Sequence, residues 1–191
     1  RDIVERALAG LVNLTHRGGV GADARTGDGA GILTQIPSEL FRSELPAISD
    51  AGFGVGMLFL PAGEGLADAA RNVAGAALAA RGFEVIGFRV VPVAPSVLGH
   101  IAASTQPVIE QVFVRQPQGE STEAFERSLM LARRAIERAW IAAGIANADV
   151  ISLSCRTIIY KGFCLPEDLA AFYADLRDPR FESAIALFHQ R

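Results

Sequence analysis

The sequence lacks the features that mark membrane proteins and nucleic-acid-binding proteins. No uninterrupted apolar run reaches the ~18 residues that a spanning helix needs, and the most hydrophobic stretch, 85–103, contains Arg89, His100 and two prolines. The net charge is −3 with a pI near 5.6, so there is no general basic field to attract a polyanion. We therefore expect no membrane span and no nucleic-acid binding.

Cysteine, histidine and lysine are scarce, and each scarcity excludes a kind of site. Cys155 and Cys164 are nine positions apart in a mostly extended stretch, which separates them by ~30 Å, whereas a disulfide needs ~6 Å. The three histidines match neither HExxH nor a zinc spacing with cysteine, so we expect no metal site. The single lysine, Lys161, is far from the glycine-rich segment 18–31, which excludes a Walker phosphate loop there.

Length and composition predict a folded chain. With 191 residues, of which 50% are hydrophobic and 20% charged, we expect one domain, or one domain with a sizeable insertion. No basic and apolar leader precedes the first helix, so we expect a cytoplasmic protein. The first residue is not methionine and the last, Arg191, follows an apolar run, so we expect both ends to be truncated.

Periodicity predicts a regular order of elements in the middle of the chain. Strands and helices are expected in the order β, α, β, β, α, β, at 54–60, 65–80, 83–93, 108–115, 121–143 and 150–160. This is the order of a ferredoxin-like unit, so 52–162 is predicted to be an insertion with its own core. The flanks are expected to hold helices from Asp2, at 37–44 and from Pro166, and a strand at 32–36.

The segment 18–31 is the most informative local feature, because six of its fourteen residues are glycine. It precedes a strand, whereas the dinucleotide-binding fingerprint follows one, so it is not a Rossmann loop. A surface turn and the polar wall of a pocket both fit its composition. Since no GxSxG elbow is present, His16 and His189 are expected to be structural rather than parts of a hydrolase triad.

Four motifs, in order, resemble the class II glutamine amidotransferase domain of the glutamate synthase large chain. They are HRGGVGAD at 16–23, TGDGAGIL at 26–33, RTIIYKG at 156–162, and PRF at 179–181 with the run 184–191. The resemblance implies an α+β fold: an Ntn-hydrolase-type αββα four-layer sandwich, of which 1–191 is a partial domain, with the ferredoxin-like insertion inside it. It also implies that 184–191 is a strand.

The resemblance implies glutamine hydrolysis in the complete protein. In this family a first-residue cysteine attacks the side-chain amide of L-glutamine, with its own α-amino group as base, and ammonia passes to a synthase domain that acts on 2-oxoglutarate. Neither Cys155 nor Cys164 matches that nucleophile, so no catalytic residue is assigned and the fragment alone is expected to be inactive. Arg191 is matched to the residue that binds the substrate's α-carboxylate, Arg17 to a second substrate-binding residue, and Gly18 and Asp28 to the site wall.

The resemblance also implies cofactors and partners elsewhere in the polypeptide. FMN and an iron–sulfur cluster are expected in the synthase part and none in this chain, with the synthase domain and a reductase subunit or ferredoxin as partners. The electron donor stays open between NADPH, NADH and ferredoxin. The alternative hypothesis is a non-enzymatic, ACT-like regulatory or interaction module, in which the insertion binds a small metabolite and Arg191 has no role.

Overall fold

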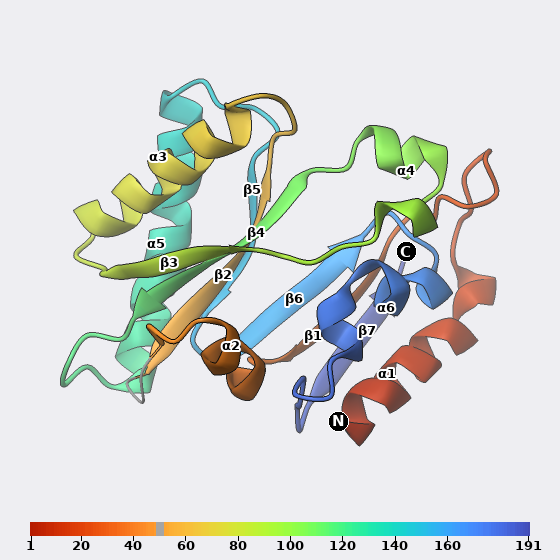
Figure 1. Cartoon of the computed structure of the whole chain (residues 1–191), viewed down its shortest axis with the longest axis horizontal. Coiled ribbons are helices and arrows are strands. Elements are labelled where there is room, and N and C mark those ends of the chain that lie inside the picture. The colour runs from red at the N-terminus through yellow and green to blue at the C-terminus, as the bar shows by residue number, and fades with distance from the viewer. Residues whose placement is uncertain (49–51) are drawn as a thin grey trace. The chain divides into compact units, whose positions relative to one another are not determined.

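The structure, a computed structural model, describes residues 1–48 and 52–191 (Figure 1). The chain divides into two compact units, which are described separately. The first unit comprises Arg1–Ser43, Val91–Gln106 and Ile159–Arg191, and the second comprises Glu44–Val90 and Pro107–Ile158. Within the described ranges, no helix is both long enough and apolar enough to cross a bilayer.

The second unit is an antiparallel sheet with helices on one face. Its elements are β2 (Phe53–Leu60), α3 (Leu66–Ala80), β3 (Val85–Val90), β4 (Val108–Arg115), α5 (Thr122–Ala142) and β5 (Asp149–Ser154). The strand order is β3-β4-β2-β5, and each neighbouring pair is antiparallel. The first and third strands along the chain are therefore central, and the elements follow the β, α, β, β, α, β order that the periodicity predicts.

Helix α5 supplies much of this unit's core. Its buried residues lie three or four positions apart and form one face: Phe125, Leu129, Ala132, Ile136 and Trp140. Ser121 caps the helix, because its hydroxyl accepts a hydrogen bond from the Ala124 amide at 3.2 Å. The helix ends before Gly144, which has a φ of +69°, a conformation that glycine adopts at little cost.

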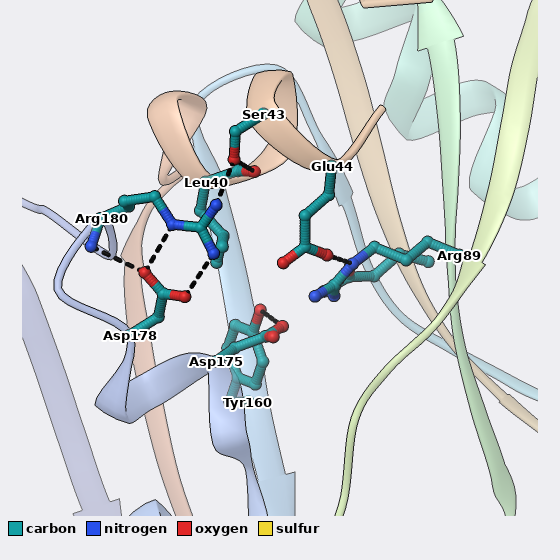
Figure 2. Close-up of polar contacts among 9 residues, drawn as sticks. Leu40, Ser43, Glu44, Arg89, Tyr160, Asp175, Asp178 and Arg180 are labelled. Atoms are coloured by element: carbon teal, nitrogen blue, oxygen red, sulfur yellow. Dashed lines mark hydrogen bonds and ion pairs between the residues drawn. The ribbon is translucent and has the colours of Figure 1, made fainter. Parts of the chain in front are cut away.

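One charged pair is buried against the sheet. The carboxylate of Glu110, on β4, is 1% exposed and accepts a hydrogen bond from Nε of Arg71 at 2.7 Å. The second carboxylate oxygen pairs with the same guanidinium, so the contact is bidentate. Nε of Arg89, on β3, donates to the carboxylate of the more exposed Glu44 at 2.5 Å (Figure 2).

The strand predicted at 150–160 is wrong, because two strands occupy this region. Strand β5 ends at Ser154 and β6 (Thr157–Gly162) belongs to the other sheet. The Ser154 hydroxyl accepts hydrogen bonds from the amides of Arg156 and Thr157 at 2.9 and 3.1 Å, which forms the turn. The chain therefore passes from one sheet to the other at a serine turn, which apolar periodicity does not reveal.

The first unit contains a three-stranded sheet of order β6-β1-β7, with β1 at Ala30–Gln35 and β7 at Ala186–Gln190. The predicted strand near the C-terminus is therefore confirmed. Helix α1 (Asp2–Asn13) lies beside β7 (Figure 1). Gly10 is so close to the Phe188 ring that a Cβ there would come within 2.7 Å of it. The helix begins at Asp2, as expected, and its N-cap residue Arg1 makes no side-chain cap hydrogen bond.

The shorter elements of the first unit complete its outline. They are η1 (Thr15–Arg17), α2 (Ser38–Glu44, whose last residue belongs to the second unit), η2 (Pro95–Val97), α4 (His100–Ser104), η3 (Pro166–Asp168), α6 (Leu169–Phe172) and η4 (Ala174–Arg177). The sequence predicted neither η2 nor α4. Their segment is anchored to the unit where Val93 forms a β-bridge with Tyr173 and the Ala94 amide donates to the Phe172 carbonyl at 2.9 Å.

Candidate functional site

The glycine-rich segment is a short hairpin. The Asp28 amide donates to the Gly19 carbonyl at 3.1 Å, Val20 forms an antiparallel bridge with Gly27, and the Gly21 amide donates to the Thr26 carbonyl at 2.7 Å. We call residues 19–28 the glycine hairpin, with its base at Gly19 and Asp28 and its tip between Gly21 and Thr26. The glycine hairpin directly precedes β1 in the chain.

The base of the glycine hairpin is hydrogen-bonded to the backbone of Arg191, the residue that follows β7. The Gly19 amide donates to the Arg191 carbonyl at 3.4 Å, and the Arg191 amide donates to the Gly29 carbonyl at 3.0 Å. The backbone of Arg191 therefore lies between two parts of the glycine-rich segment. The structure brings together two segments that are more than 160 positions apart in the sequence, as the residue numbers show.

Gln190 fills the space that Gly18 leaves. A Cβ on Gly18 would fall 1.7 Å from Nε2 of Gln190, so a side chain there would displace the amide. Nε2 donates to the Thr15 carbonyl at 3.5 Å, which links β7 to the 3-10 turn that contains Arg17. Among the described residues, Oε1 of Gln190 is a buried polar atom without a hydrogen-bond partner. The absence of a Cβ at position 18 thus allows β7 and the turn to approach closely.

The predicted site residues gather around this junction. Arg17 ends η1 and Gly18 follows it, while Asp28 lies at the base of the glycine hairpin and Arg191 is held beside Gly29. The side chains of Arg17, Asp28 and Arg191 are exposed. Within residues 1–48 and 52–191, the guanidinium groups of Arg17 and Arg191 have no hydrogen-bond or ion-pair partner in the protein. An exposed guanidinium without a protein partner is suited to bind a carboxylate.

Gly27 is fixed by a contact with backbone. A Cβ at this position would lie 2.4 Å from the carbonyl oxygen of Cys164 and 3.1 Å from the amide nitrogen of Leu165. Backbone atoms cannot move aside as a flexible side chain can, so only glycine fits without a shift of the hairpin or of the 164–165 segment. Close contact with backbone therefore explains why glycine occupies position 27 of the segment 18–31.

A charged turn leads the chain into β7 (Figure 2). Nε of Arg180 donates to the Asp178 carboxylate at 2.8 Å, and the Arg180 guanidinium also donates to the Ser43 hydroxyl at 2.6 Å. The side-chain hydrogen bond from Arg180 is the main cause that lowers the pKa of Asp178 to about 2. The next residue, Phe181, is buried and stands edge-on to the ring of Tyr160 at 5.6 Å, so the turn fixes the start of the segment that carries Arg191.

Neither cysteine is suited to act as a nucleophile. Burial raises the pKa of the Cys164 thiol to about 12, and its side chain is 1% exposed. Burial, and then the hydrogen bond to Glu126, raise the pKa of Cys155 to about 12. In the described part of the chain, no group of three or more histidine, cysteine, aspartate or glutamate residues is placed to hold a metal ion.

Comparison with known proteins identifies the family. A model of the class-II glutamine amidotransferases matches residues 1–191. The chain is 40% identical over 196 residues to the glutamate synthase (NADPH) large chain of Azospirillum brasilense and 43% identical over 196 residues to the chloroplastic ferredoxin-dependent glutamate synthase of Spinacia oleracea. It is 39% identical over 198 residues to the NADPH large chain of Bacillus subtilis.

These relatives are much longer than the chain. Each alignment covers 100% of the chain but 13%, 12% and 13% of the Azospirillum, Spinacia and Bacillus proteins, respectively. The family model matches residues from both units of the structure. The chain therefore belongs to the class-II glutamine amidotransferase family.

Proposed function

We propose that this chain is part of the glutaminase domain of a glutamate synthase, where it binds L-glutamine for hydrolysis to glutamate and ammonia. The observation that carries the proposal is the junction at which the backbone of Arg191 lies between Gly19 and Gly29. The family match and the three relatives support it. The ACT-like alternative is not proposed, because the family match includes the first unit as well as the second.

Arg191 is the proposed partner of the substrate's α-carboxylate. A guanidinium is always charged at neutral pH and binds a carboxylate through two parallel hydrogen bonds. Its backbone is held by two hydrogen bonds, from the Gly19 amide and to the Gly29 carbonyl, so the backbone at this position is ordered before binding. Arg17 supplies a second positive charge, and Gly18 and Asp28 form the adjacent wall.

The proposed chemistry is thioester formation by a cysteine outside residues 1–191. Its thiol attacks the side-chain amide carbon of glutamine, the carbon–nitrogen bond breaks, and the amide nitrogen leaves as ammonia after accepting a proton. Water then attacks the glutamyl thioester, which releases glutamate and restores the thiol. Since Cys155 and Cys164 both have raised pKa values, we expect the fragment alone to be inactive.

The proposed complete fold is the Ntn-hydrolase-type αββα sandwich of the family. In that architecture the sheet β6-β1-β7 of the first unit is part of one layer. The proposed ferredoxin-like insertion lies within 52–162, and the elements of the second unit supply its β, α, β, β, α, β order with β2 and β4 as central strands. Within that range, Val91–Gln106 and Ile159–Gly162 belong to the first unit.

The proposed cofactors belong to the synthase part of the protein. An iron–sulfur cluster needs several cysteine ligands, whereas here Cys164 is buried in the first unit and Cys155 lies in the second, bonded to Glu126. We therefore assign no residue of this chain to the cluster or to FMN. The names of the relatives specify NADPH in two and ferredoxin in one, so the proposed electron donor is a reductase subunit or ferredoxin.

The test is glutaminase activity of the full-length protein. Ammonia release from L-glutamine is expected from the complete polypeptide and is expected to be absent from residues 1–191 alone. If the complete polypeptide binds an amino acid through residues 52–162 and releases no ammonia, the regulatory alternative is correct. The sequence on either side offers an independent check: a Cys-Gly pair upstream and an Asn-Gly pair downstream are expected.

A further inference from the structure

The tip of the glycine hairpin is closed by the side chain of Asp23. This carboxylate is 4% exposed, and its Oδ1 accepts hydrogen bonds from the amides of Arg25 at 3.1 Å and Thr26 at 2.8 Å. Oδ2 accepts a hydrogen bond from the Thr26 hydroxyl at 2.7 Å. These contacts hold the pKa of Asp23 well below its ordinary range, the Thr26 hydroxyl being the largest cause. The tip is therefore built around a permanently charged acceptor.

The same two side chains fasten the tip to the segment 97–102. Oδ2 of Asp23 also accepts from the Ile101 amide at 3.1 Å, and the Thr26 hydroxyl accepts from the Ala102 amide at 3.2 Å. Arg25 adds a third link, since its guanidinium donates to the Val97 carbonyl at 3.3 Å. Because Asp23 and Thr26 are 78 and 76 positions from their partners on this segment, the contacts are tertiary rather than local.

Gly99 shows how closely the two segments fit. A Cβ at this position would lie 2.4 Å from the Thr26 hydroxyl oxygen, 2.5 Å from Oδ2 of Asp23 and 2.6 Å from the Thr26 amide nitrogen. The φ of Gly99 is −64°, which any residue adopts, so glycine is needed here for space rather than for conformation. The absence of a Cβ at Gly99 therefore allows the hairpin tip to approach this segment closely.

The segment 97–102, which holds the tip, follows residues that are themselves anchored. Shortly before it, Val93 forms a β-bridge with Tyr173, and the Ala174 amide donates to the Pro92 carbonyl at 3.1 Å. Tyr173 is buried, and its hydroxyl donates to the Lys161 carbonyl at 2.7 Å. The glycine hairpin is thus held at its base by the Arg191 backbone and at its tip by the segment 97–102.

We propose that Asp23, acting with Thr26, is a positioning residue that fixes the glycine hairpin in the conformation in which its base and Arg191 bind glutamine. This inference rests on the proposed function. Without Asp23 the tip loses its hydrogen bond from Ile101, and the Thr26 hydroxyl loses the acceptor that orients it. The hairpin is then less ordered before glutamine binds, and the conformational entropy that is lost on binding weakens affinity. Because the reacting cysteine lies outside the hairpin, the effect falls on KM for glutamine rather than on kcat.

The test uses the full-length protein and steady-state glutaminase kinetics. Asp23→Ala and Thr26→Val are each expected to raise KM for glutamine about tenfold, which corresponds to one lost hydrogen bond to a charged group, with kcat within about twofold. Thr26→Ser keeps the hydroxyl and is expected to restore the KM of the unaltered protein. Hydrogen exchange of peptides covering 19–28 is expected to be faster in the first two variants and unchanged in the third.

Two controls separate positioning from damage. Asp149→Asn removes an exposed carboxylate at the start of β5 and is expected to leave KM unchanged. Glutamate formation from added ammonia bypasses glutamine binding and is expected to be the same in all variants. If Asp23→Ala does not fold, the pair Thr26→Val and Thr26→Ser decides.

The outcomes distinguish this inference from the proposed function. An unchanged KM in Thr26→Val, alongside faster exchange at 19–28, overturns the positioning role while glutaminase activity still supports the proposed function. Absence of glutaminase activity in the unaltered full-length protein overturns the proposed function itself.

Discussion

The amide of Arg191 donates a hydrogen bond to the carbonyl of Gly29 at 3.0 Å, and the Arg191 carbonyl accepts one from Gly19 at 3.4 Å. These two contacts place the C-terminal arginine beside a hairpin built near the N-terminus. They belong to the edge of β7, where the β1 register continues from Ala30 opposite Gln190. The backbone that carries the proposed carboxylate-binding guanidinium is therefore fixed by the glycine-rich segment.

Replacement of Gly27 tests the fit of the glycine hairpin. Gly27→Ala is expected to destabilise the first unit by about 2 kcal/mol or more, because the new Cβ meets the Cys164 carbonyl and cannot be accommodated by rotamer change. Gly87→Ala is the matched control, since a Cβ on Gly87 meets nothing within 4 Å. Hydrogen exchange of peptides covering 19–28 is the measurement. Equal protection in the two variants would show that the close approach at Gly27 does not constrain the hairpin.

The acid sensitivity of the turn before β7 depends on Asp178. Since its pKa in the folded protein is lowered to about 2, mainly by the Arg180 guanidinium, the carboxylate contributes stability above its unfolded pKa of about 3.9. That contribution is lost as the pH falls from about 5 to about 2. Protection of peptides covering 178–190 against hydrogen exchange is expected to decrease in this window. In Asp178→Asn, protection is expected to be lower at pH 7 and to change less on acidification.

Cys164 is expected to be unreactive in the folded protein. With a pKa of about 12, its thiolate fraction at pH 8 is about a thousandfold smaller than that of an ordinary thiol, and its burial adds a steric barrier. Mass spectrometry of the peptide that contains Cys164 is expected to show alkylation by iodoacetamide only after denaturation. As the pH rises above about 9, the unfolded thiol ionises while the folded one does not, so the free energy of unfolding is expected to fall. Rapid labelling at pH 8 would contradict the burial of this group.

Elements in which an apolar period repeats over many residues can be predicted from the sequence. Helix α5 has a five-residue buried face with a serine cap before it and a positive-φ glycine after it, and each of these features has a direct signal. The strand at 150–160 was not divided correctly, because the break depends on one serine hydroxyl and on pairing with two different sheets. Such pairing is tertiary, and no local pattern contains it.

The candidate site was only partly accessible to sequence reasoning. The motif at 16–23 suggested a loop, but its hairpin pairing depends on backbone contacts that composition does not specify. The support at 97–102 was missed because η2 and α4 are three and five residues long, too short for a helical period. A usable signal was present in Asp23 followed three residues later by Thr26, a pattern typical of a side chain that closes its own turn.

The most direct test of the account compares glutamine with 4-aminobutanamide, which keeps the amide and the amine but lacks the α-carboxylate. In the full-length protein, kcat/KM is expected to favour glutamine strongly, and Arg191→Ala is expected to remove about 2 kcal/mol of that preference while changing kcat/KM for 4-aminobutanamide little. Arg191→Lys is expected to restore part of the preference, because it keeps the charge but not the bidentate geometry. If Arg191→Ala discriminates between the two compounds as well as the unaltered protein does, Arg191 does not bind the carboxylate and the proposed site is wrong.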